Sequence, residues 1–151
     1  MIDQRILDFI GEHHVLTVSC VSQAGEPWCA NAFYVFDSEE EGFIITSEEK
    51  TRHAQLFLIR PLVAGSVVLE TEEIGKIRGL QFTATVRRCE GGLFDRCRLK
   101  YLRRFPYALF KRGEVWILRA ETLKYTDNRL GFGKKLYWER DSLPSREAES
   151  K

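Results

Sequence analysis

The stretch LQFTATVR, residues 80–87, alternates between apolar and polar side chains. A period of two places the apolar side chains on one face of an extended strand and the polar side chains on the other. A strand of this kind buries one face and leaves the other exposed, which is typical of antiparallel sheets. A parallel α/β sheet would need a helix between most of its strands, and the chain does not supply them.

The remaining pattern predicts short strands with few helices. Apolar residues at near-helical spacing predict three helices, at 2–12, 48–59 and 93–105. Alternating or β-rich runs bounded by Gly, Pro and Asp predict strands at 15–21, 28–36, 42–46, 62–69, 75–89, 115–119 and 123–125. We therefore expect an α+β, mainly β fold: a small antiparallel β-barrel in which the second helix crosses between the third and fourth strands.

Length and composition predict one soluble domain. The 151 residues include 44% hydrophobic side chains, enough for a single buried core, and we place the domain at 1–141 with a polar tail at 142–151. The net charge of +1 gives the whole molecule no strong attraction to nucleic acid or anionic lipid. Charges interrupt the first apolar run, and no run approaches the ~18 apolar residues of a membrane span, so we expect a cytoplasmic protein.

The residues that most often bind metals are scattered. His13 and His14 are adjacent, and His53 stands alone, so no pair has the spacing of ligands on one helix face. The cysteines form no C-x-x-C pair; they are Cys20, Cys29, Cys89 and Cys97. We expect free thiols and no metal site.

The stretch TSEEKTRHAQL, residues 46–56, joins a predicted strand to a predicted helix. Thr46 with Glu49 three residues later fits a capping box, with acids at the positive end of the helix dipole. Lys50 and Arg52 follow within the same turns and indicate a second interpretation, an anion site. The two acids would occupy the end of the helix that an anion would otherwise use, so the anion would depend on side chains.

The segment RCRLKYLRRFPYALFKR, residues 96–112, contains many basic residues and no acid. Cations interleaved with aromatics suit a nucleic-acid surface. The interpretation we favour is a solvated face on a helix and its exit, and a phosphate-bearing substrate is a further alternative. In the favoured interpretation the buried stripe consists of Leu99, Leu102, Phe105, Leu109 and Phe110.

The chain resembles the FMN-binding split barrels related to pyridoxamine 5'-phosphate oxidase in one region. The resemblance is carried by the order of residues in the stretch 46–56 and in the RPLV that follows at residues 60–63. A closer resemblance, from about His14 to Asp141, is to the YhbP-type bacterial proteins, which are grouped with those barrels. It is carried by several separated segments in order: WCANAFYVFD, EEKTRHAQ, IRGLQF, RRFP and KYTDNRLGFGKKLYW. The resemblance implies an antiparallel split β-barrel with a flavin-binding-like domain.

The resemblance also implies a site for FMN. Its dianionic phosphate needs charge-assisted donors, and its flat ring needs backbone amides beside an apolar wall. The implied cofactor-binding residues are Ala30, Asn31, Ala32, Phe33, Thr46, Ser47, Lys50, Thr51, Arg52, Arg78, Lys134 and Trp138. It names no catalytic residue.

The C-terminal stretch YTDNRLGFGKKLYW, residues 125–138, combines turn residues with Lys134, Lys135 and Trp138. It predicts either a tight loop before a last strand or a lid over the flavin. Split barrels are commonly homodimers with the flavin between subunits, so the resemblance implies a homodimer in which this loop reaches the partner's site. The Arg-x-His that the oxidases place near a Trp is not visible here, which argues against pyridoxamine phosphate oxidation.

Two functional classes fit these observations. The first is an FMN-dependent oxidoreductase acting on an unknown small molecule, in which the cofactor carries the electron chemistry. The second is a non-catalytic binding or sensing module that holds flavin, haem or another flat ligand in the same pocket. Both predict a pocket with a basic mouth, a small-molecule ligand, and neither nucleic acid nor membrane as partner.

Overall fold

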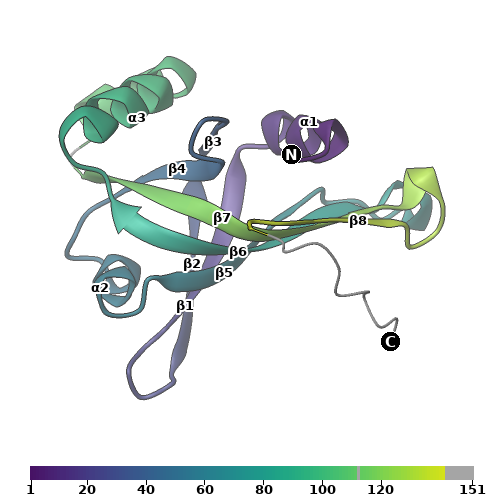
Figure 1. Cartoon of the computed structure of the whole chain (residues 1–151), viewed down its shortest axis with the longest axis horizontal. Coiled ribbons are helices and arrows are strands. Elements are labelled where there is room, and N and C mark those ends of the chain that lie inside the picture. Colours follow the sequence, from purple (N-terminus) through teal and green to yellow (C-terminus); the bar gives the residue numbers. More distant parts are fainter. Residues whose placement is uncertain (112, 142–151) are drawn as a thin grey trace.

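The chain folds around an eight-stranded antiparallel sheet with the strand order β2-β1-β5-β6-β7-β4-β3, in which β8 also pairs with β7 (Figure 1). The computed structural model describes residues 1–111 and 113–141. Its elements are α1 (Gln4–Glu12), β1 (Val15–Val21), β2 (Pro27–Phe33), β3 (Val35–Asp37), β4 (Gly42–Ser47), α2 (Arg52–Ile59), β5 (Leu62–Val68), η1 (Ile74–Lys76), β6 (Arg78–Arg88), α3 (Gly91–Arg104), η2 (Pro106–Phe110), β7 (Glu114–Asp127), η3 (Asn128–Leu130) and β8 (Lys135–Glu139). The predicted fold class, an α+β, mainly β antiparallel split barrel, is confirmed.

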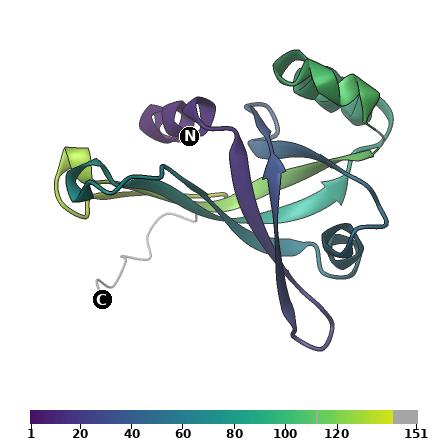
Figure 2. The ribbon, with the colours of Figure 1, turned by 180° about the vertical axis from the view of Figure 1, so that it is seen from behind.

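Strand β7 connects the two halves of the sheet. One edge pairs with β6 along its length, while the other edge pairs first with β4 and then with β8. Arg140 fills the junction between those two partners, because its Nε donates to the Ala120 carbonyl at 2.8 Å and its Nη2 donates to the carbonyls of Glu40 and Glu41. The β4 end of β7 lies near α3, and the β8 end lies far from α2 and α3 (Figures 1 and 2).

Burial along the strands explains two kinds of sequence pattern. Strands β1, β5 and β6 alternate buried residues with half-buried or exposed ones, so no second core among the described residues covers their other face. Strand β4 and the first half of β7 instead bury nearly every residue, because the main core covers one face and α3 with η2 covers the other. Apolar runs without alternation therefore mark the part of the sheet that is covered on both sides.

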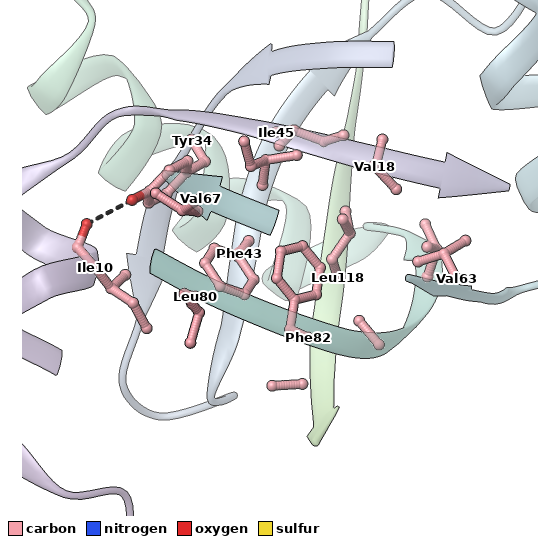
Figure 3. Packing of buried hydrophobic residues seen from close by; sticks show 14 of the residues in the cluster. Ile10, Val18, Tyr34, Phe43, Ile45, Val63, Val67, Leu80, Phe82 and Leu118 are labelled. Carbon is pink, nitrogen blue, oxygen red and sulfur yellow. Dashed lines mark hydrogen bonds between the residues drawn. The ribbon is translucent and has the colours of Figure 1, made fainter. Parts of the chain in front are cut away.

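The main core lies between the sheet and α1, whose Ile10 packs among the strand side chains (Figure 3). Phe43 of β4 and Phe82 of β6 stack with ring centroids 4.6 Å apart. Tyr34 is fully buried between β2 and β3, and its hydroxyl donates to the Ile10 carbonyl at 2.7 Å. Gly65 has no room for a side chain, since a Cβ would lie 2.3 Å from the Phe82 ring and 2.5 Å from the Thr17 carbonyl oxygen. These contacts hold β1, β5 and α1 against one core.

Three strand boundaries differ from the sequence prediction. The strand predicted at 28–36 is two strands, because the chain leaves its pairing with β1 at Phe33 and pairs with β4 from Val35. The strands predicted at 115–119 and 123–125 are the single strand β7, in which a register shift opposite Thr83 and Ala84 adds an extra residue, Glu121. The strand predicted at 75–89 begins only at Arg78, after η1. The predicted tail at 142–151 lies outside the described residues.

The stripe predicted for the basic segment is largely wrong. Leu99, Leu109 and Phe110 are 51%, 59% and 88% exposed, whereas Phe105 is buried. The helix instead buries Cys97 and Tyr101, because the face that meets the sheet is set by the position of β3 and β4 rather than by the most apolar side chains. Within the described residues, no helix is both long and apolar enough to cross a membrane.

Helix α3 is anchored by the buried carboxylate of Asp37, whose side chain is 3% exposed. Arg96 Nη1 donates to both oxygens at 2.9 Å, and Lys100 Nζ donates at 3.1 Å. Burial alone would raise the pKa of Asp37, but the hydrogen bonds from the Glu40 N–H, Arg96 and Lys100 outweigh it and hold the pKa below its ordinary value. The carboxylate is therefore charged at neutral pH and fixes α3 to the β3–β4 turn.

Asp37→Asn should destabilise the fold. We expect a loss of roughly 1 to 2 kcal/mol, around the lower end of the 1.5 to 3 kcal/mol typical of charged hydrogen bonds, because Arg96 and Lys100 remain more than a third exposed. Urea denaturation at pH 7 measures it. The matched control is Glu39→Gln, which removes a 78% exposed partner of the same Arg96 and should cost less than ~0.5 kcal/mol.

The destabilisation caused by Asp37→Asn should also depend on pH. Because the folded pKa of Asp37 is lowered, its contribution is complete above the unfolded pKa of ~3.9 and is lost as the pH falls through the folded pKa. The stabilities of wild type and Asp37→Asn should therefore converge only in strong acid. Equal stabilities of the two proteins at pH 7 would contradict the anchoring role.

Candidate functional site

A pocket of about 500 Å³ opens where edge strand β2 meets the end of β4. Helix α2 begins on one side of it, and α3 and η2 close the other. This is the seam of the split barrel, where β2 contacts β4 although the two strands share no ladder. The lining residues are Asn31, Ala32, Phe33, Thr46, Ser47, Glu48, Thr51, His53, Tyr101, Tyr107, Ala108 and Lys111.

Half of the residues predicted from sequence meet in this pocket. Asn31, Ala32 and Phe33 come from β2, and Thr46, Ser47 and Thr51 come from the end of β4 and the start of α2. Thr17 Oγ1 donates to Asn31 Oδ1 at 2.7 Å, which leaves the amide nitrogen of Asn31 as a donor. Ala30, the remaining β2 residue of the prediction, packs against the main core instead.

The polar end of the pocket is a cluster of two hydroxyls and one imidazole. Ser47 Oγ lies 2.5 Å from His53 Nε2, and Thr51 Oγ1 lies 3.3 Å from both atoms. Which atom donates depends on the histidine tautomer. If His53 Nε2–H donates to Ser47, the serine O–H is free to donate into the pocket.

The predicted capping box at Thr46 is wrong, because helix α2 starts six residues later than that residue. Thr46 is still paired in β4, opposite Val115, and the N-cap is Thr51, whose Oγ1 accepts from the Ala54 N–H at 3.3 Å. The acids Glu48 and Glu49 therefore precede the helix, and its first turn carries no acid. Helix α2 starts beside the pocket, because Thr51 and His53 line it, so the positive end of the helix can favour an anion there.

His53 is half-buried beside this helix end. Burial lowers the pKa of its imidazole from the ordinary value, so the ring is neutral at pH 7. Its ring packs against Phe57 in a T-shaped arrangement, with centroids 5.6 Å apart. A neutral imidazole that contacts Ser47 is positioned to take up a proton when an anion enters.

The two cations that the sequence placed at the anion site lie outside the pocket lining. Lys50 is 83% exposed in its side chain and pairs with Glu48 at 3.0 Å. Arg52 lies over the Trp28 ring, with 4.4 Å from its guanidinium carbon to the ring centroid, and approaches Glu26 at 3.8 Å. Both side chains are exposed enough to move, but in this structure neither cation lines the pocket, whereas the acid Glu48 does.

Arg78, Lys134 and Trp138 lie toward the other end of β7. Arg78 pairs with Glu12 at 2.9 Å and with the Tyr125 hydroxyl at 3.0 Å, and Trp138 packs against the main core. Leu123, opposite Trp138, is nine residues along β7 from Glu114, opposite Ser47, which corresponds to about 30 Å of strand. Within one chain these residues do not join the pocket, so their predicted role would need a second copy.

Sequence reasoning missed His53 and the wall formed by Tyr101, Tyr107 and Lys111. Tyr101 is buried in α3, and its hydroxyl reaches the Phe33 carbonyl at 3.5 Å, which joins α3 to the edge of β2. Burial raises the pKa of Tyr101 although a hydrogen bond with Thr46 opposes it, so the phenol stays protonated. The sequence signal that could have indicated His53 is its position just after the start of a helix, with the hydroxyl of Ser47 just before that start.

The described residues form no cluster of the side chains that usually bind metal ions. Across residues 1–111 and 113–141, no three His, Cys, Asp or Glu side chains come close enough together to hold a metal ion.

No family model matches the chain. It is 46% identical over 137 residues to a UPF0306 protein of Citrobacter koseri, covering 91% of this chain and 93% of that one. It is 48% identical over 134 residues to the UPF0306 protein YhbP of Escherichia coli K12, covering 89% and 90%.

Solved structures with the same fold are more distant in sequence. The heme storage protein HutZ of Vibrio cholerae superposes with a TM-score of 0.67 at 19% identity, covering 79% of this chain and 89% of that one. A NimC/NimA family protein of Clostridium acetobutylicum gives 0.69 at 15%, covering 91% of each chain. A FAD-binding protein of Mesorhizobium loti gives 0.63 at 9%, covering 82% and 92%.

These similarities have different weights. At under 25% identity the solved structures establish the split-barrel fold, which is shared by proteins that bind flavin or haem. The sequence relatives match at nearly half of all positions over nine-tenths of the chain. The chain therefore belongs to the UPF0306 family, the YhbP-type proteins that its sequence resembles.

Proposed function

We propose that the pocket at the β2–β4 seam binds FMN and that the protein is a flavin-dependent oxidoreductase for an unknown small molecule. The observation that carries the proposal is the polar cluster of Ser47, Thr51 and His53 at the start of α2, next to a strand edge with unpaired backbone groups. Flavin supplies the electron chemistry when bound, and the chain supplies binding, orientation and exclusion of water.

The phosphate of FMN fits the polar end. Ser47 offers a hydroxyl, and the first turn of α2, which contains no acid, offers N–H groups. The Thr51 hydroxyl donates to the Glu48 carbonyl, and the Glu48 side chain, whose residue also lines the pocket, is paired with Lys50. His53 can donate once protonated, which adds a charge-assisted bond to a dianion. We place the phosphate here rather than on Lys50, because the Lys50 ammonium is engaged by Glu48.

The ring fits along β2. This strand pairs only with β1, so half of its backbone N–H and C=O groups are available to a ring's heteroatoms. Phe33 and Tyr107 line the same wall and provide an apolar surface. The volume of about 500 Å³ lies within the usual range for small-molecule sites.

The second candidate is a non-catalytic haem-binding or sensing module. HutZ shares the fold, and His53 is a lining residue that could serve as an axial ligand. Its Nε2 is engaged by Ser47 in this structure, so the histidine would have to exchange that contact for the iron. We favour flavin for this reason, and absorption titrations with FMN and hemin decide between them.

We also propose that the protein is a homodimer. The uncovered face of β1, β5 and β6 carries small and uncharged residues, among them Thr17, Ser19, Ala64, Ser66 and Thr83. Val15 and Val68 are 42% and 68% exposed on the same strands. A weakly charged sheet face of this kind, with exposed valines, suits a second copy, which could also bring Lys134 and Trp138 of the partner toward the pocket.

Ser47→Ala should weaken FMN selectively. Removing a hydroxyl that faces the phosphate costs a charge-assisted hydrogen bond of about 1.5 to 3 kcal/mol, or roughly 10- to 150-fold in Kd. Riboflavin, which lacks the phosphate, should bind both proteins equally. Fluorescence titrations of the two flavins measure the difference.

Arg52→Ala is the companion variant, because the sequence motif places that residue at the phosphate. In the observed arrangement, with Arg52 over Trp28, it should leave FMN affinity unchanged. Equal losses of FMN and riboflavin in Ser47→Ala, or no FMN binding by the wild type, would end the proposed phosphate site.

The imidazole of His53 should report the anion directly. In the ligand-free protein its pKa should lie below the ordinary ~6.5, and FMN should raise it because a dianion favours the charged ring. Histidine NMR titrations with and without FMN measure this, with riboflavin as the uncharged comparison. His13, whose pKa is also lowered by burial but which lies outside the pocket lining, should not respond.

Ala64→Arg should separate the dimer. The position is exposed on β5, between Ser19 and Thr83, so a monomer can accommodate arginine while a close sheet-to-sheet contact cannot. We expect the wild type to be a dimer that buries more than ~1,200 Å² and the variant to be a monomer by light scattering. The control is Ala24→Arg, at an exposed turn away from that face. A monomeric wild type would contradict the proposal.

A further inference from the structure

Most of the described basic residues of α3 have structural partners. Arg96 and Lys100 hold the carboxylate of Asp37, and Arg104 Nη2 donates to the His13 carbonyl at 2.6 Å. Because these charges are used inside the protein, helix α3 does not present the continuous cationic stripe that nucleic acid requires. The described cations that remain in segment 96–111 are Arg98, Arg103, which is exposed on α3, and Lys111, which follows η2.

Arg98 and Lys111 have no structural role of this kind among the described residues. Among the described residues, neither makes an ion pair or a hydrogen bond with a carboxylate, although Arg98 is half-buried. Lys111 lies over the Tyr107 ring, with 5.7 Å from Nζ to the centroid. A half-buried guanidinium normally has an anionic partner, because removal from water costs free energy that a counter-charge offsets.

Both cations line one small cavity. It measures about 10 Å³, enough for a single water or an oxygen of an acid group, and its lining adds Arg98, Leu102 and Gly113 to Thr46, Tyr101, Ala108 and Lys111. The last four residues also line the large pocket. This small chamber therefore adjoins the large pocket, and its lining residues include the cations Arg98 and Lys111 and the hydroxyl-bearing Thr46 and Tyr101.

The chamber and the polar cluster proposed for the phosphate of FMN share no residue, although Gly113 of the chamber lies against the Ser47 backbone. Arg98 and Tyr101 lie three residues apart, on one face of α3, whereas Ser47, Thr51 and His53 belong to β4 and α2 and do not line the chamber. A single FMN phosphate can occupy either the polar cluster or the chamber. With the phosphate at the polar cluster, the chamber is available to a different molecule.

We propose that Arg98 and Lys111 form a subsite for the carboxylate or phosphate of a second ligand, whose flat body lies in the large pocket. That this ligand is the substrate rests on the proposed flavin function. The chamber admits only the acid oxygens, while Phe33 and Tyr107, 6.4 Å apart and roughly edge to face, border the space for the body. The substrate class is a small, planar or aromatic monoacid.

The experiment uses the full chain and three probes of similar size. Benzoate and phenyl phosphate separate the two acid types, and benzamide is the neutral analogue. Dissociation constants come from NMR titrations of wild type, Arg98→Gln, Lys111→Gln and Arg103→Gln. The last is the matched control, because Arg103 is exposed on the same helix and lines neither cavity.

We expect wild type to bind at least one acid about tenfold or more tightly than benzamide, and Arg98→Gln and Lys111→Gln to lose that preference. Arg103→Gln should behave as wild type, and benzamide should bind all four proteins alike, which also shows that the variants are folded. Acids that bind no better than benzamide, or equally to Arg98→Gln and Arg103→Gln, would overturn the subsite.

An FMN titration separates this proposal from the proposed function. If FMN does not bind but the acids depend on Arg98, the flavin function fails and the subsite stands. If Arg98→Gln weakens FMN and not riboflavin, Arg98 holds the cofactor's phosphate and the assignment to a second ligand is overturned. Unchanged FMN binding by Arg98→Gln supports two separate anion places.

Discussion

The pairing along β7 is the constraint on which the rest of the fold depends. This strand has only two edges, and because β6 occupies one of them, β4 and β8 must share the other. The bulge at Glu121 and the side chain of Arg140 fill the junction where one partner gives way to the next. The end of β4 is thereby carried to the seam with β2, where the pocket opens.

The pocket in turn depends on contacts that do not touch a ligand. Asp37 holds α3 through Arg96 and Lys100, and α3 brings Tyr101 to the carbonyl of Phe33. Tyr34, buried where the chain passes from β2 to β3, keeps the edge of β2 at the seam. A change at Asp37 can therefore alter ligand binding as well as stability, although its carboxylate lies outside the pocket lining.

The site offers hydroxyls, a neutral imidazole, aromatic rings and a few cations, which suit binding and orientation of a cofactor that carries its own chemistry. The fold brings about half of the implied cofactor residues together in the pocket. Asn31, Thr46 and Ser47 are among them, because they lie on strands that the family pattern places side by side. Lys50 and Arg52 lie outside the pocket, because nearby acids and the Trp28 ring bind their long, exposed side chains. Spacing along a chain does not reveal such competitors.

The sequence by itself determined the strand and helix types, because alternation in β6 and the unbroken apolar run in β4 reflect local burial on one face or two. It also determined the family, since matched segments are spread along most of the chain. Only the tertiary structure decided that α2 begins at Arg52, that Cys97 and Tyr101 rather than Leu99 are buried, and that Arg98 and Lys111 share a chamber with Thr46. Those outcomes depend on contacts between residues far apart in the chain, whose geometry is fixed only when the sheet closes.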